Sequence, residues 1–238
     1  MRNRNNNRFT TVAKSSVGEE KPLSVIIPVA GIGHRMKSYG PKCLLSVDGR
    51  YTILDNIIRL VRNTYKNCEI IVCVGFEADK VISSLDKDIR VVENQMYTHT
   101  NTVESLRLAL NNKIHDDVLI IYGDLVFNSK TIQNISEKES YAIVDSGNNF
   151  DKNDVGLTIV DESITSFAYG LDVKWAQIVF LTGRELKLFH RYCSDRSKSK
   201  LYAFEILNMV LRNGGKIKAY EPANMKIKEI DSVKDLHK

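Results

Sequence analysis

The sequence has few of the features that mark the specialised classes of protein. It contains only four cysteines, and no two of them have the CxxC spacing: Cys43, Cys68, Cys73 and Cys193. This spacing disfavours a zinc site or a disulfide framework and favours reduced thiols in a reducing compartment. No apolar run approaches the roughly 20 residues of a membrane span. We therefore expect a cytoplasmic protein that makes no contact with a membrane.

An excess of charge of one sign is also absent from most of the chain. The net charge is +5, but four of these charges come from residues 1–18, which contain no acidic residue. The nearly neutral remainder offers no stripe for a nucleic acid, so no nucleic-acid partner is expected. Residues 1–21 are rich in Asn, Arg and Ser and lack the apolar centre of a secretory signal. We expect them to form a disordered tail before one domain at 22–238.

Short apolar runs alternate with helical periodicity along that domain. Helices are predicted from Thr52, Glu77 and Asn101, and later at 184–192 and 202–213. Such alternation predicts an α/β fold with three layers and a mostly parallel, mixed sheet, Rossmann-like in character. The expected strands are 23–29, 69–75, 89–92, 118–122, 141–144, 156–160, 164–169, 174–181, 217–220 and 227–230.

A glycine-rich segment with two nearby cations follows the first strand. Small residues at Val29, Ala30, Gly31 and Gly33 would let backbone N–H groups approach an anion, and Arg35 and Lys42 would add fixed positive charge. The segment is not a P-loop, because no Gly-Lys-Ser/Thr ends it. By themselves the two glycines also fit an ordinary tight turn between a strand and a helix. Ligands of such sheets bind beyond the carboxyl ends of the strands, where Gly75 and Asp124 are also expected.

Four segments, in the same order, resemble the sugar-nucleotide and cytidylyl transferases of the GT-A-like nucleotidyltransferase fold. The first resembles the family's Ala-Ala-Gly-x-Gly-x-Arg-Met signature followed by Pro-Lys. The next three resemble a nucleotide-contacting segment of phosphocholine-type cytidylyltransferases, a metal-binding aspartate at a strand end, and a closing Glu-Ile-Asp motif. In this chain they are Pro28 to Met36 with Pro41-Lys42, Glu93 to Leu106, Tyr122-Gly123-Asp124, and Glu229-Ile230-Asp231-Ser232 with Asp235-Leu236.

The resemblance implies a magnesium-dependent transfer of a nucleoside monophosphate. Asp124 and Asp231 would hold Mg²⁺, a hard cation that accepts one or two carboxylates together with substrate phosphates. Taken singly, Asp124 also fits a turn, and Asp231 a helix N-cap. Arg35 would hold the leaving phosphates, and Lys42 would neutralise charge near the α-phosphate. The implied nucleotide contacts are Val29, Ala30, Gly31, Gly33, Arg35, Lys42, Gly75, Asn101, Ser105 and Asp124.

The implied acceptor site lies over the second half of the chain, where a small acceptor-binding insertion is expected. Its candidate residues are Tyr169, Lys174, Trp175 and Glu205. The two aromatic rings could face a cationic head group, but ordinary strand packing explains them equally well. Glu205 could bind the acceptor or face solvent.

Departures from the family pattern narrow the expected substrates. Val29 replaces the usual first Ala, and His34 replaces a small or hydroxyl residue. Asn101-Thr102 stands where many hexose-1-phosphate transferases have Thr-Gly-Gly, which favours CTP and a phosphocholine-like, phosphonate or sugar-phosphate acceptor. A sugar-1-phosphate nucleotidyltransferase using UTP, GTP or dTTP is the main alternative. A GT-A glycosyltransferase or a non-catalytic nucleotide-binding regulator is an alternative of another class. A homodimer is a further expectation.

Overall fold

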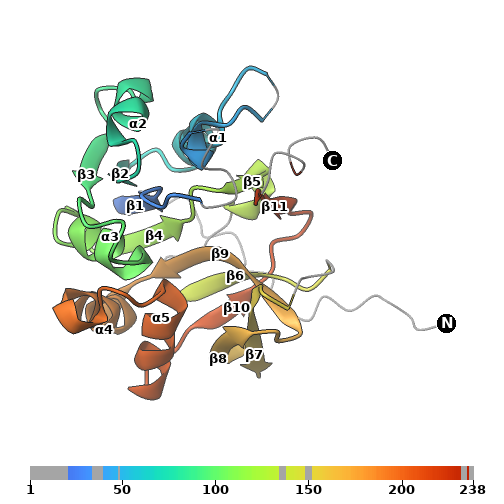
Figure 1. Cartoon of the computed structure of the whole chain (residues 1–238). Helices are drawn as coiled ribbons and strands as arrows, with labels where there is room; N and C mark the ends of the chain where they lie inside the picture. The colour runs from blue at the N-terminus through green and yellow to red at the C-terminus, as the bar shows by residue number, and fades with distance from the viewer. Residues whose placement is uncertain are drawn as a thin grey trace.

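A nine-stranded mixed sheet organises the chain (Figure 1). The computed structural model describes residues 21–33, 40–47, 49–133, 138–147, 152–231 and 235. The strands lie in the order β3-β2-β1-β4-β9-β6-β10-β8-β7. Their bounds are β1 Leu23–Pro28, β2 Cys68–Val74, β3 Arg90–Glu93, β4 Asp117–Ile121, β6 Tyr141–Asp145, β7 Val155–Val160, β8 Ser163–Tyr169, β9 Val173–Leu181 and β10 Lys218–Tyr220.

The first four strands of this sheet pair in parallel, with β1 between β2 and β4. Apolar residues occupy both faces of β1, because Val25 and Ile27 pack into one core cluster and Ile26 into the other. This double burial explains why the run is continuously apolar rather than alternating. Parallel strands also place the residues that follow β1, β2 and β4 at one edge.

Helices cover both faces, so the expected three layers are confirmed (Figure 1). The helices α1 (Ile53–Thr64) and α2 (Ala78–Ser84) contribute to one core cluster. The helices α3 (Thr102–Leu110), α4 (Gly183–Ser194) and α5 (Ala203–Arg212) contribute to the other. A reciprocal capping box between Thr52 and Asp55 starts α1, and such caps stabilise a helix by about 1 kcal/mol. Short 3₁₀ helices lie at η2 (Lys42–Leu44), η3 (Ser129–Thr131) and η4 (Arg196–Lys198).

Pairing becomes mainly antiparallel in the second half of the sheet. The strand β9 runs antiparallel to both β4 and β6, and β7 and β8 form a hairpin. The mixed sheet is therefore confirmed, but parallel pairing predominates only among β1 to β4. Beyond the end of β4, β5 (Leu125–Phe127) pairs with β11 (Ile227–Glu229) in a separate two-stranded sheet. Over the described part of the chain, no helix has both the length and the apolarity to cross a bilayer.

Candidate active site

Backbone hydrogen bonds fix the glycine-rich turn against the end of β2. The amide of Val29 donates to the carbonyl of Cys73 at 2.9 Å, and the amide of Phe76 donates to the carbonyl of Ala30 at 3.0 Å. Gly75 allows this approach, because a Cβ there would lie only 2.8 Å from the Cβ of Ala30. The absence of a side chain at Gly75 therefore lets Ala30 pack directly against the backbone that follows β2.

Gly123 is required for a similar close approach, and this yields a test of the turn. A Cβ at Gly123 would lie 2.1 Å from Cγ1 of Val29 and 3.1 Å from the carbonyl of Pro28. Gly123→Ala should therefore lower the melting temperature and weaken nucleotide binding roughly tenfold. Val29→Ala removes the clashing methyl group, so the double variant should recover most of both losses. Thermal melts and equilibrium titration would check this, and a double variant no better than Gly123→Ala would contradict the proposed contact.

A cavity of about 240 Å³ opens beside the turn. Eight of the predicted nucleotide-binding residues line it: Val29, Ala30, Gly31, Gly33, Lys42, Asn101, Ser105 and Asp124. Gly75 lies behind the wall, and Arg35 and His34 fall outside the described residues. The lining also includes residues that were not among the predicted nucleotide contacts, and all but Cys43 belong to the recognised motifs: Pro28, Cys43, Asn94, Tyr97, Thr100, Thr102, Tyr122 and Gly123. The sequence thus identified the turn and the start of α3, and the structure joins them into one cavity.

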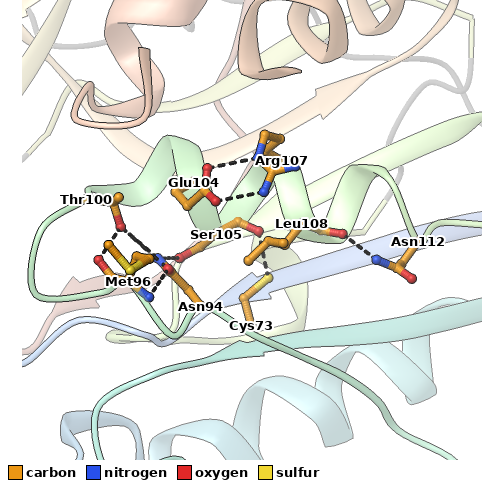
Figure 2. A network of polar contacts seen from close by, with 9 residues as sticks. All are labelled: Cys73, Asn94, Met96, Thr100, Glu104, Ser105, Arg107, Leu108 and Asn112. Atoms are coloured by element: carbon orange, nitrogen blue, oxygen red, sulfur yellow. Dashed lines mark hydrogen bonds and ion pairs between the residues drawn. The ribbon is translucent and has the colours of Figure 1, made fainter. Parts of the chain in front are cut away.

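A hydrogen-bond network centred on Asn94 holds one wall of the cavity (Figure 2). Its amide nitrogen donates to Thr100 Oγ1 at 3.1 Å and to Ser105 Oγ at 3.2 Å, and its oxygen accepts from the amide of Met96 at 3.0 Å. Asn94 is only 2% exposed. Both its donor and its acceptor groups are engaged, so Asn94 orders the turn that leads into α3.

Lys42, Asp124 and Asp231 meet at the mouth of this cavity. The ammonium of Lys42 lies 2.9 Å from Asp124 Oδ2 and 3.2 Å from Asp231 Oδ1. Burial favours the neutral amine, but Asp124 and then Asp231 outweigh it and raise the pKa of Lys42. The ammonium is therefore charged at neutral pH.

Backbone contacts bring the two aspartates together across 107 residues of sequence. The amide of Ile230 donates to the carbonyl of Asp124 at 2.9 Å, which extends the pairing of β5 with β11. The amide of Asp231 then donates to Oδ2 of Asp235 at 3.2 Å, so the second aspartate of the closing motif holds the backbone of the first. Ser232 and Leu236 of that motif lie outside the described residues.

Glu229 adds a third carboxylate that the sequence did not assign to the site. Burial, Asp124 and Asp231 raise its pKa, while Gln177 and Lys174 act in the opposite direction. Gln177 has φ at 56°, in the left-handed region where a non-glycine residue is strained, as often found at functional sites. Lys174 lies 3.5 Å from Glu229 Oε2 and 3.0 Å from Asp154 Oδ2. Glu229 stood within the recognised closing motif, but only the structure shows that its charge interacts with both aspartates.

The charge of Glu229 should destabilise the protein when no metal is bound. Because its pKa is raised on folding, the folded state binds the proton more tightly, and stability falls as the pH rises above the unfolded value near 4.5. Glu229→Gln should therefore raise the melting temperature at pH 7 by roughly 2–4 °C, the shift that about 1 kcal/mol produces in a domain of this size. The gain should shrink toward pH 5. Melts with and without Mg²⁺, with Glu93→Gln as an exposed control, would check it, and an unchanged or lower melting temperature for Glu229→Gln would contradict it.

The residues at this edge fit a magnesium ion. The Oδ1 atom of Asp124 is buried and has no hydrogen-bond partner among the described residues, and such an orphaned oxygen is costly unless a ligand uses it. The described residues contain no group of three His, Cys, Asp or Glu side chains close enough to enclose a metal by themselves. Mg²⁺ does not need such a cage, because it commonly takes one or two carboxylates and completes its shell with phosphates and water.

The four predicted acceptor residues lie in three different settings. Trp175 is 2% exposed, donates to the carbonyl of Ile178, and packs edge-on against Tyr122 and Phe167. Its ring is core packing, and the expectation that it faces a head group is corrected. Tyr169 is 52% exposed, and its ring lies edge-on to Phe204 with centroids 5.3 Å apart.

The remaining two residues are held by protein contacts. Lys174 is paired with carboxylates, as described. Oε2 of Glu205 accepts from the amide of Tyr202 at 2.8 Å, so Glu205 caps α5 rather than simply facing solvent. Gly156 pairs with both Ala168 and Lys174, so these three residues share one face of the sheet, and Tyr169, the residue after Ala168, lies on the opposite face. Tyr169 thus lies on the side of the sheet where its ring meets Phe204 of α5, whereas Lys174 lies on the side of Glu229.

Comparison with known proteins agrees with this fold. The chain is 24% identical over 223 residues to the bifunctional protein GlmU of Buchnera aphidicola, a match that covers 87% of the chain and 48% of that relative. No protein-family model matches the chain. The chain thus spans about half the length of this curated relative.

Solved structures share the fold over nearly the whole chain. The CTP:phosphocholine cytidylyltransferase LicC of Streptococcus pneumoniae superposes with a TM-score of 0.76 and 18% identity, covering 91% of this chain and 96% of that one. A UDP-glucose pyrophosphorylase of Acinetobacter baumannii gives a TM-score of 0.68 and 12% identity, covering 91% of each chain. The chain has the nucleotidyltransferase fold. The resemblance that the four motifs indicated is therefore confirmed at the level of the fold.

Proposed function

We propose that the protein is a magnesium-dependent nucleotidyltransferase that transfers CMP from CTP to a small phosphorylated acceptor and releases pyrophosphate. The observation that carries this proposal is the meeting of Lys42, Asp124 and Asp231 at a cavity lined by the glycine-rich turn. The turn offers backbone and small side chains to a nucleotide, and the two carboxylates offer oxygens to a cation. A purely binding role would not need the paired carboxylates.

The arrangement supports an in-line displacement. A phosphate oxygen of the acceptor attacks the α-phosphorus of the nucleotide, the bond from that phosphorus to the bridging oxygen breaks, and pyrophosphate leaves with the electron pair. The attacking oxygen is already anionic, so catalysis depends on position and charge rather than on a general base. Asp124 and Asp231 would hold Mg²⁺, which when bound neutralises phosphate charge. Lys42 lies at the same mouth, where its ammonium can stabilise charge that develops at the α-phosphate.

An exposed aromatic cluster at the start of α5 favours a cationic or amphipathic head group in the acceptor. Tyr169, Phe204 and Tyr202 form an aromatic cluster, with ring centroids 5.3 and 5.9 Å apart, and Tyr169 and Tyr202 are both half exposed. Exposed aromatic faces attract quaternary ammonium groups. LicC, similar in fold, is described as acting on phosphocholine. A phosphocholine-like acceptor is therefore our first choice, ahead of a phosphonate or a sugar phosphate.

The aromatic cluster makes a testable contribution to acceptor binding. Tyr169→Ala should raise the KM for a phosphocholine-like acceptor roughly tenfold, because a desolvated cation–aromatic contact is worth about 1–2 kcal/mol. The KM for the nucleotide should stay within about twofold. Tyr169→Phe keeps the ring and should behave like the unaltered protein in steady-state assays. An equal loss in both variants, or none in either, would remove the cluster from the acceptor site.

A sugar-1-phosphate nucleotidyltransferase that uses UTP, GTP or dTTP is the second candidate. It is favoured by the likeness to a UDP-glucose pyrophosphorylase. A pyrophosphate-release screen of four nucleoside triphosphates against phosphocholine, 2-aminoethylphosphonate, glycerol phosphate and hexose 1-phosphates separates the two. Release with CTP and phosphocholine supports our first choice, and release with UTP and a hexose 1-phosphate supports the second. Consumption of a nucleotide sugar without pyrophosphate release would instead indicate a glycosyltransferase.

A further inference from the structure

The ammonium of Lys42 occupies the place where a metal ion would be expected. It contacts one oxygen of Asp124 and one of Asp231, at 2.9 and 3.2 Å. Glu229 lies close enough to both aspartates to interact with them electrostatically. The nearby Lys174 is shared between Glu229 and Asp154. Lys42 therefore supplies the positive charge that lies directly on the aspartate pair.

The side chain of Lys42 also passes beside the turn that would hold the phosphates. A Cβ built on Gly33 would lie 3.8 Å from Cβ and 3.9 Å from Cδ of Lys42. The backbone of Lys42 is fixed, because η2 is closed by a bond from Leu44 to the carbonyl of Pro41 and from Leu45 to the carbonyl of Lys42. A lysine side chain has four methylene groups, and the bonds that join them rotate freely. From one fixed backbone, its ammonium can therefore reach either the carboxylates or an anion beside Gly33.

We propose that Lys42 is the resident counter-ion of the Asp124–Asp231 pair, and that it moves from these carboxylates to the nucleotide's phosphates as a divalent cation replaces it. This inference rests on the proposed function. A divalent cation and an ammonium repel each other on the same carboxylates, so the exchange becomes favourable when phosphates arrive to receive the ammonium. Metal and nucleotide should therefore strengthen each other's binding, by the same factor in both directions.

Direct metal binding tests the exchange without any measurement of turnover. Free Mn²⁺ would be titrated into the protein without nucleotide and followed by electron paramagnetic resonance. Lys42→Met should bind Mn²⁺ at least tenfold more tightly than the unaltered chain. Two control variants should bind Mn²⁺ with the same affinity as the unaltered chain. Lys42→Arg keeps the positive charge at the site. Lys218→Met removes a lysine on β10 that pairs with Glu139 at 2.7 Å.

The second arm adds saturating CTP or UTP to each sample. The nucleotide should increase the Mn²⁺ affinity of the unaltered chain at least tenfold and that of Lys42→Met by a clearly smaller factor. Should Lys42→Met fail to fold, Lys42→Gln, which keeps a donor without the charge, carries the same expectation.

The outcomes separate this inference from the proposed function. Equal Mn²⁺ affinity of the unaltered chain and Lys42→Met without nucleotide would overturn the counter-ion role, and would mean that the cation uses Asp124 Oδ1 while Lys42 stays in place. Tighter Mn²⁺ binding by Lys42→Met together with no binding of any nucleotide would support the counter-ion role and count against the proposed function. No Mn²⁺ binding by any variant would overturn both.

Discussion

Asp124→Ala will lower turnover on the order of a thousandfold while leaving the melting temperature close to that of the unaltered protein. Asp124 carries a buried oxygen with no partner among the described residues and shares an ammonium with Asp231. Removing an acid that organises charge at the reacting phosphate removes stabilisation that exists only in the transition state. Asp231→Ala should show a loss of the same order. Steady-state rates at saturating substrates and Mg²⁺, alongside thermal melts, measure both.

Asp116, at the opposite end of β4 from Asp124, provides a matched control. Asp116 is exposed and precedes β4, whereas Asp124 follows its end. Asp116→Ala should retain full activity, which also tests the glycosyltransferase alternative, because Asp116-Asp117 is the nearest candidate for an Asp-x-Asp motif in that reading. Near-normal turnover of a folded Asp124→Ala would show that this residue does not hold the metal. A large loss in Asp116→Ala would shift the site to the opposite edge.

Lys42→Met should lower kcat roughly a hundredfold and change the Kd for the nucleotide by only a few-fold. One preorganised charge aimed at a transition state contributes on the order of 3 kcal/mol. The backbone that carries the ammonium is preorganised here, because Pro41 restricts the chain before Lys42 and the hydrogen bonds of η2 close around it. Single-turnover rates and equilibrium nucleotide binding, measured on the same preparations, separate the two quantities.

A lysine that merely anchors the triphosphate would behave in the opposite way. Its removal would raise the Kd strongly and leave the rate at saturation almost unchanged. Lys80→Met, which breaks the ion pair between Lys80 of α2 and its N-cap residue Glu77, serves as a control with no expected effect on either constant. Equal losses in rate and affinity for Lys42→Met would leave it as a binding residue only.

Local sequence patterns were sufficient to predict most elements of the fold. The continuous apolar runs at β1, β2 and β4 are buried on both faces, as parallel strands between helices require. Thr52 and Asn101 were predicted to start helices, and both accept backbone hydrogen bonds there. These features depend on neighbours in sequence, so a single chain reveals them.

Features that depend on distant partners could not be predicted in the same way. Within the described part of the chain, three-residue β5 pairs with β11 alone, about a hundred residues later, and its short run gives no periodicity. Trp175 was a reasonable ligand contact by residue type, but β9 is buried between β4 and β6 and turns that ring into the core. Glu229 stood in a recognised motif, yet its charge coupling to Asp124 follows from the β5–β11 pairing.

The most direct test of the central claim is to follow the label of a nucleoside triphosphate during turnover. With the nucleotide and acceptor selected by the screen, label in the α-phosphate should enter a product that contains the acceptor, in equal amount to the pyrophosphate released. Label in the γ-phosphate should appear only in pyrophosphate. Transfer of the γ-label to the acceptor, or release of the α-label as free nucleoside monophosphate alone, would contradict nucleotidyl transfer.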